Sequence, residues 1–171
     1  MNISQRMFSF ESFDLLYLSD ADSGQISMVL LPPNMPHRYL DRRVNLDIPE
    51  LKRNALPCPA WEVGSLCHLS LRNRAQSNGA GGTLLGGIST KEMKCHQQDV
   101  VSHDGSIEIR TVLRSDDGYE IVHTAAHHSA EDGIEVQTVF TNRSAQPVQL
   151  ELLTSFALDN LSPFALDDAP L

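Results

Sequence analysis

Asp-Gly pairs divide the second half of the chain at nearly regular intervals, at residues 104–105, 117–118 and 132–133. Each pair is followed by a run in which apolar and polar residues alternate, which is the period of a half-buried β-strand. Short connections of this kind join antiparallel neighbours, and no stretch between them has the 3.6-residue period of a helix. Residues 104–158 therefore predict a meander of four antiparallel strands. Several short strands at such spacing are typical of an all-β sandwich or barrel.

The last two runs lie within residues 134–158, which read IEVQTVFTNRSAQPVQLELLTSFAL. A cluster of turn formers at 142–147 separates them, because Asn and Ser side chains bond nearby backbone and proline fixes φ. We expect the two runs to pair as a long antiparallel hairpin with one face in the core. The residues expected on the core face are Ile134, Val136, Thr138, Phe140, Val148, Leu150 and Leu152.

The first half of the chain is less regular. Apolar runs at residues 13–18 and 26–31 flank a turn signal, DADSG, and so predict a first hairpin. Prolines are dense between residues 32 and 59, which excludes a long strand or helix there. Further strands are expected at residues 66–72 and 91–101, on either side of a glycine-rich loop at 78–87.

Composition and charge indicate the cellular compartment and exclude some classes of partner. The 171 residues fit one domain, and 22 acidic against 13 basic residues give a net charge of −9. Such a surface repels phosphate backbones and anionic headgroups, so no nucleic acid and no membrane partner is expected. Three cysteines cannot complete a disulfide framework, and the N-terminal residues lack the apolar stretch of a signal peptide. These features indicate a cytoplasmic protein.

Ten residues in the C-terminal part resemble a known family: Val139, Asn142, Ser144, Pro147, Val148, Leu150, Glu151, Ser155, Leu158 and Asp159. They match the N-x-[SG] turn, the pV-x-LE strand start and the SxxLD element of one domain type. That type is the N-terminal β-supersandwich domain of the melibiase-type α-galactosidases of glycoside hydrolase family 36. The likeness covers residues 119–164, and residues 138–140 stand where relatives often carry a more basic strand.

The resemblance implies a galactose-mutarotase-like supersandwich, an antiparallel β-sandwich that spans residues 1–171 as a single N-terminal domain and is incomplete at its C-terminus. The family's catalytic (β/α)8 barrel, which holds both catalytic aspartates, would lie outside this chain. The domain would then be non-catalytic, pack on that barrel, contribute to a homo-oligomer and shape the entrance for galactosyl oligosaccharides. Two alternatives stay open. One is the equivalent sandwich of a phosphorylase or hydrolase with an (α/α)6 barrel, and the other is a free-standing binding or assembly module.

Trp61 is the only tryptophan, and it follows the proline-rich stretch directly. A largely buried Trp commonly caps a sandwich core. The resemblance offers a second role, because in some α-galactosidases of this family an aromatic residue on an N-terminal-domain loop reaches a neighbouring active site. In that role the indole face would stack on a sugar ring, with Glu62 and Asp47 as acceptors for its hydroxyl groups. These three residues are the predicted substrate-binding set.

No residue is assigned a catalytic role. Glycosidases need two carboxyl groups, but the neighbouring carboxylates at 116–117 and 131–132 precede glycine in turns, and those at 167–168 lie near the chain end. His123 and His127 would share one strand face about 13 Å apart, too far to bind one metal ion, and with His128 they are expected to be solvated. The glycine-rich loop lacks the lysine of a phosphate-binding loop. We therefore expect no metal and no cofactor.

Overall fold

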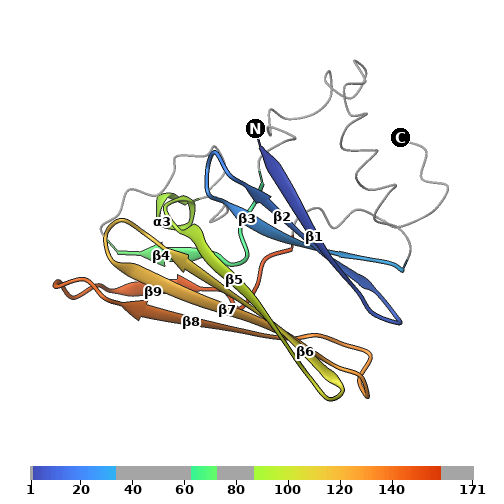
Figure 1. Ribbon diagram of the computed structural model, residues 1–171. Helices are drawn as coiled ribbons and strands as arrows, with labels where there is room; N and C mark the ends of the chain where they lie inside the picture. The colour runs from blue at the N-terminus through green and yellow to red at the C-terminus, as the bar shows by residue number, and fades with distance from the viewer. Residues whose placement is uncertain (1, 34–62, 73–86, 159–171) are drawn as a thin grey trace, which may run out of the picture.

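The structure is a computed structural model that describes residues 2–33, 63–72 and 87–158 (Figure 1). Nine strands and one short helix make up this part of the chain. In order they are β1 Ile3–Ser9, β2 Asp14–Asp20, β3 Ile26–Leu31, β4 Leu69–Leu71, α3 Ile88–Lys91, β5 Lys94–His103, β6 Ser106–Arg114, β7 Tyr119–His128, β8 Glu135–Asn142 and β9 Leu150–Leu153.

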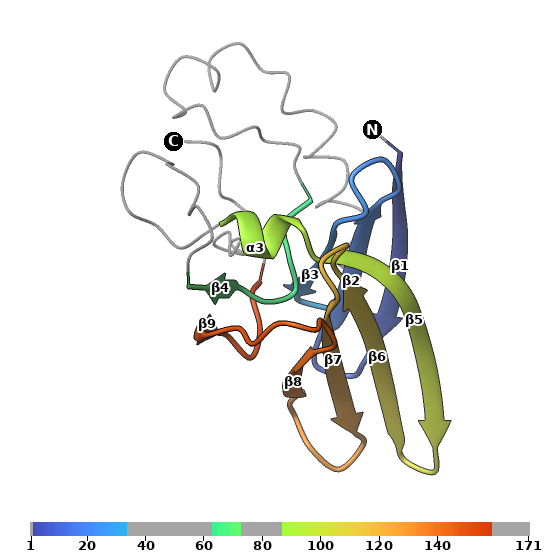
Figure 2. The ribbon, with the colours of Figure 1, turned by 90° about the vertical axis from the view of Figure 1, so that its left-hand side faces the viewer.

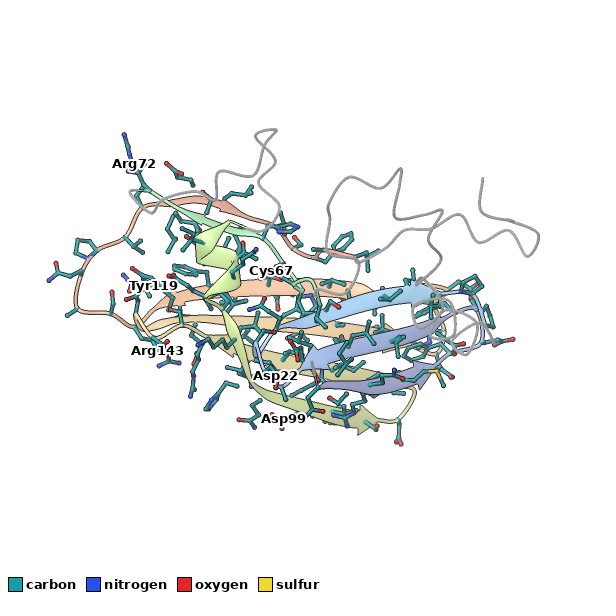
Figure 3. The ribbon with its side chains drawn as sticks, turned by 90° about the horizontal axis from the view of Figure 1, so that it is seen from above. Asp22, Cys67, Arg72, Asp99, Tyr119 and Arg143 are labelled. Atoms are coloured by element: carbon teal, nitrogen blue, oxygen red, sulfur yellow. The ribbon has the colours of Figure 1, made fainter. Side chains whose placement is uncertain are left out.

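The strands form three antiparallel sheets, with the orders β1-β2-β3, β4-β9 and β5-β6-β7-β8. From above, the β1–β3 sheet lies over one part of the four-stranded sheet, and β4, β9 and α3 lie beside it (Figure 3). A single core cluster draws side chains from all three sheets, so they enclose one hydrophobic interior. The prediction of an all-β sandwich is confirmed.

This core cluster comes mainly from residues that alternate along their strands, with Phe13, Leu66, Cys67 and Met93 added from the connections. Its buried members are Phe13, Leu15, Tyr17, Ile26, Met28, Leu66, Cys67, Leu69, Leu71, Met93, Ile109, Leu113 and Ile121. On β6 and β7 the alternate residues, such as Glu108 and Thr124, point to the other face of the sheet. The predicted alternation of these two strands is therefore confirmed.

Strands β2 and β3 are buried on both faces. Leu15 and Tyr17 face the main core, whereas Leu16 and Leu18 belong to a second cluster with Val29, Leu31 and Val63. A strand covered on both sides has a continuous apolar run instead of an alternating one, as the sequence of β2, DLLYLSD, shows. The predicted first hairpin is confirmed, and it forms the centre of a two-sided layer.

The predicted hairpin of residues 134–158 is wrong, although both of its strands exist. β8 pairs with β7, and β9 pairs with β4 across the sandwich. The four-stranded meander therefore contains β5 in place of β9 (Figure 2). The connection between β8 and β9 is long and internally bonded, since Asn142 Oδ1 accepts from Ser144 N at 2.9 Å and Ser144 Oγ donates to Gln146 O at 2.9 Å. It carries the chain to another sheet instead of folding it back.

The strand β9 also differs in its buried face. Leu150 was expected in the core but is largely exposed, whereas Leu153 packs against the core cluster. The pairing of β4 with β9 shifts register between Ser70 and Leu71, and this irregularity changes which side chains face inward.

Three smaller differences concern the ends of elements. The strand β1 was not predicted. It is an exposed edge strand, and its sequence ISQRMFS shows little alternation of apolar and polar residues. Only Leu69–Leu71 of the expected strand at 66–72 forms a ladder. The strand expected at 91–101 begins later, at Lys94, because Ile88–Lys91 forms one helical turn.

Gly118 provides a test of how the turns contact one another. It has φ 85°, and a Cβ there would lie 3.3 Å from the backbone of Ser144, in the connection between β8 and β9. Gly118→Ala should therefore lower the free energy of unfolding by about 1–3 kcal/mol, measured by urea denaturation. Gly133→Ala is the matched control, since no atom lies within 4 Å of its Cβ position and its φ is not positive. Equal losses in the two variants would show that neither the positive φ nor the approach to Ser144 constrains residue 118.

Candidate functional site

The predicted substrate-binding residues Asp47, Trp61 and Glu62 lie outside the described residues, so their role stays a prediction. The same holds for the carboxylates at 167–168 and for residues 78–86 of the glycine-rich loop. Gly87 precedes the single turn of α3, which is too short to form a phosphate-binding helix start.

The described carboxylate pairs lie in the turns where the sequence placed them. Asp116 is exposed and forms an ion pair with Lys94 at 3.6 Å. Asp132 accepts a hydrogen bond from Ser12 Oγ at 2.7 Å, which links two turns across the sandwich. Within residues 2–33, 63–72 and 87–158, no three His, Cys, Asp or Glu side chains are grouped so that they could hold a metal ion.

A polar row crosses the core-facing side of the four-stranded sheet. Cross-strand register aligns Gln98 of β5, Thr111 of β6, His123 of β7 and Thr138 of β8. The outer members have partners: Gln98 Nε2 donates to Thr111 Oγ1 at 3.1 Å, and Thr138 Oγ1 donates to the carbonyl of Ser155. The row therefore runs through an otherwise apolar interior, and its centre is His123.

The expectation that His123 is solvated is wrong. Its side chain is 0% exposed, and within the described part of the chain neither Nδ1 nor Nε2 has a hydrogen-bond partner. Burial lowers the pKa of this imidazole to about 4, because the charged form would lose its hydration. Tyr17, whose side chain enters the same core from β2, also has an unpartnered hydroxyl, and burial raises its pKa. The sequence carried the signal, since His123 alternates in phase with Ile121 and Ala125.

His127 lies on the same face of β7 but in a different setting. Its ring is 4.3 Å from that of Phe10 and 5.5 Å from that of Phe13, measured between centroids. Its Nδ1 is 2.8 Å from the carbonyl of Gly133, and a carbonyl only accepts, so Nδ1 carries the proton. This histidine joins the β1–β2 turn to the connection between β7 and β8, and its role there is structural.

A charged cluster lies at the opposite end of the sheet, on its outer face. Glu120 is buried and accepts from Arg114 Nε at 2.9 Å and from Arg143 Nη2 at 2.6 Å. Arg114 Nη1 also lies 2.8 Å from His96 Nε2, and arginine only donates, so this nitrogen accepts. The cluster fastens the β6–β7 turn to the connection after β8. Sequence reasoning missed it, because Arg143 and Glu120 are far apart in the chain.

Glu120 makes a specific contribution to acid stability. Hydrogen bonds from Arg143 and Arg114 hold the pKa of its carboxyl below the ordinary value of 4.5. A depressed folded-state pKa means that this stabilisation is complete above pH 4.5 and is lost as the pH falls below it. Glu120→Gln should lower stability at pH 7 and flatten the decline below pH 4.5, measured by urea unfolding. The matched control is Glu108→Gln, which removes an exposed carboxylate from the same face and should lower stability at pH 7 less than Glu120→Gln.

The two described cysteines, Cys67 and Cys95, are free thiols. Burial raises the pKa of the Cys67 thiol to about 12 and raises that of Cys95, so neither is an activated nucleophile. Among the described helical residues, none form a span long and apolar enough to cross a membrane. No protein-family model, no curated protein and no solved structure matches this chain.

Proposed function

We propose that this chain is the non-catalytic N-terminal sandwich domain of a cytoplasmic α-galactosidase that hydrolyses terminal α-galactosyl residues of oligosaccharides. Its role is to pack on a catalytic (β/α)8 barrel of the same protein, to contribute contacts in a homo-oligomer and to shape the substrate entrance. The observation that carries the proposal is the stretch from β7 to Leu158. Those residues of the resemblance that lie between Val139 and Leu158 belong to β8, to β9 and to the segments that connect two sheets of the sandwich.

The surface of this stretch also supports the proposal. Val139, Leu150 and Phe156 are large apolar residues that are 43–50% exposed, and all three lie on or after the last two strands. If these side chains share one surface, they form the kind of apolar patch that marks a protein contact. The barrel follows this stretch in the family, so it is the proposed occupant of the surface.

An experiment on the encoded gene product tests the proposal. The longest polypeptide that contains the chain should hydrolyse an aryl α-galactoside, and residues 1–171 alone should not. Phe156→Glu should reduce the activity and the melting temperature of the long product while the 171-residue chain still folds. The matched control is Val101→Glu. Val101 is 40% exposed on β5, the edge strand of the four-stranded sheet opposite β8. It should change neither property.

Two outcomes would overturn the proposal in favour of an alternative, and a third would contradict the contact surface alone. A long product with helical hairpins and phosphorylase or inverting hydrolase activity would identify the sandwich of an (α/α)6 enzyme. A gene that ends at Leu171 would identify a free-standing binding or assembly module. Equal effects of Phe156→Glu and Val101→Glu would contradict the proposed contact surface.

A further inference from the structure

The centre of the polar row combines complete burial with unmet hydrogen-bonding capacity. His123 and Thr111 are both 0% exposed, and they are cross-strand partners on adjacent strands. Thr111 Oγ1 accepts a hydrogen bond from Gln98 Nε2, whereas both ring nitrogens of His123 lack a partner among the described residues. A buried polar group without a hydrogen bond destabilises a core, and a buried charge does so far more strongly.

No anion of the described strands and turns faces His123. The buried carboxylates among the described residues are Asp14, Asp20 and Glu120. Strand alternation places Asp14 and Asp20 on the face of β2 opposite Tyr17, and Glu120 on the face of β7 opposite His123. Within residues 2–33, 63–72 and 87–158, an imidazolium at position 123 would therefore have no carboxylate to pair with.

The other titratable or charged groups of this core do not supply an acceptor anion either. Tyr17 of β2 stays protonated, and Cys67 and Cys95 are protonated thiols. Arg6 of β1, the cross-strand partner of Tyr17, is a cation whose guanidinium lies over the Phe8 ring. His127, four residues along β7, is bonded to Gly133. The charged residues of the four-stranded sheet lie on its outer face: Lys94, Asp99, Glu108, Arg110, Arg114 and Glu135.

We infer that His123 makes the packing of the sandwich sensitive to pH, so that proton uptake by its ring in mildly acidic solution opens the contact between the four-stranded sheet and the sheet that carries Tyr17. The backbone ladders of each sheet do not involve this side chain, so the interior between the layers is the part that yields. The device is independent of the proposed enzymatic context, because it resides in the sandwich itself.

The direction and size of the effect follow from the two states of the ring. Burial holds the folded-state pKa near 4, whereas the unfolded chain takes up the proton at 6.5. Stability is therefore constant above pH 6.5, falls as the pH drops toward 4 and levels off below it. The unfolding equilibrium constant should rise about 30-fold between pH 7.5 and pH 5 through this group alone. The loss at Glu120 begins only below pH 4.5, so the two effects are separable.

Urea unfolding of the whole chain at pH 7.5, 6 and 5 tests the inference. His123→Leu and His123→Asn should both abolish the rise between pH 7.5 and pH 5, one with an apolar and one with a polar side chain. His128→Leu is the matched control, because His128 is exposed at the end of the same strand, and the rise should persist in it. An NMR titration of the native chain adds a measurement without mutation. There the His123 ring should stay neutral at pH 5 while the chain is folded.

Two results would overturn the inference. One is a native chain whose unfolding constant changes less than about threefold between pH 7.5 and pH 5, since linkage requires a larger change. The other is a His123 ring that titrates near pH 6.5 in the folded chain. Its protonation would then cost no more in the folded than in the unfolded state, so it would not open the core. If neither His123 variant folds, the NMR titration alone decides.

Discussion

Replacing Leu16 with alanine should lower the free energy of unfolding by about 2–5 kcal/mol, as much as replacing Leu15. The two residues are neighbours on β2 and point to opposite faces, yet they are 1% and 0% exposed. Leu15 belongs to the main core, and Leu16 packs with Leu18, Val29, Leu31 and Val63. Each truncation removes buried methyl groups and leaves a cavity, so both faces of this strand should respond alike.

Urea denaturation of both variants, with Met7→Ala as the control, measures this. Met7 is the cross-strand partner of Leu16 and therefore lies on the same face of the sheet, but it is 47% exposed on the edge strand. Its replacement should cost less than about 1 kcal/mol. If Leu16→Ala is no more destabilising than Met7→Ala, the second face of β2 is not a core, and the sandwich has only one interior.

The strands were predictable where a local pattern fixes them. Alternation along β6, β7 and β8 and the Asp-Gly turn before each of them follow from side-chain geometry over a few residues. The glycine of two of these turns has a positive φ, 75° at Gly105 and 85° at Gly118, which explains the residue type there. The continuous apolar runs of β2 and β3 likewise follow from burial on two faces.

Strand partners were not predictable in the same way. The run at 148–152 looks like the second arm of a hairpin, but hydrogen bonding with β4 across the sandwich decides its place. That choice depends on residues about 80 positions apart, and an alternating pattern contains no information about which edge a strand joins. For the same reason β1 was not predicted, because its alternation is weak and it forms a strand by pairing with β2.

For the polar row, the sequence predicts the strand face on which His123 lies but not the residues that align with it. Alternation places His123 on the core side of β7, in phase with Ile121 and Ala125. Its alignment with Thr111 and Thr138 needs the register of three strands, which only the folded sheet supplies. The three histidines were expected to be solvated as strand-end residues, whereas His123 lies in the middle of β7 and is buried.

Phe10, Phe13 and His127 form an aromatic cluster near the C-terminal end of β7. We expect this cluster to be the main contact between the two layers at that end. Phe13 lies in the core cluster, with its ring 5.5 Å from that of His127 in an edge-on arrangement and 4.8 Å from that of Phe10. Phe13→Ala removes a ring that contacts the β1–β2 turn and β7 together. We expect a loss of about 3–5 kcal/mol in the free energy of unfolding, because a large buried side chain is truncated to a methyl group.

Ser12→Ala is the matched control in the same turn. It removes the hydroxyl that bonds Asp132 at 2.7 Å, an exposed contact between the same two parts of the molecule. Such a bond contributes about 0.5–1.5 kcal/mol at most, because water replaces the lost partner. Urea unfolding of both variants compares the two links directly. A loss in Ser12→Ala as large as that in Phe13→Ala would mean that the hydrogen bond, and not the aromatic packing, holds this end of the sandwich closed.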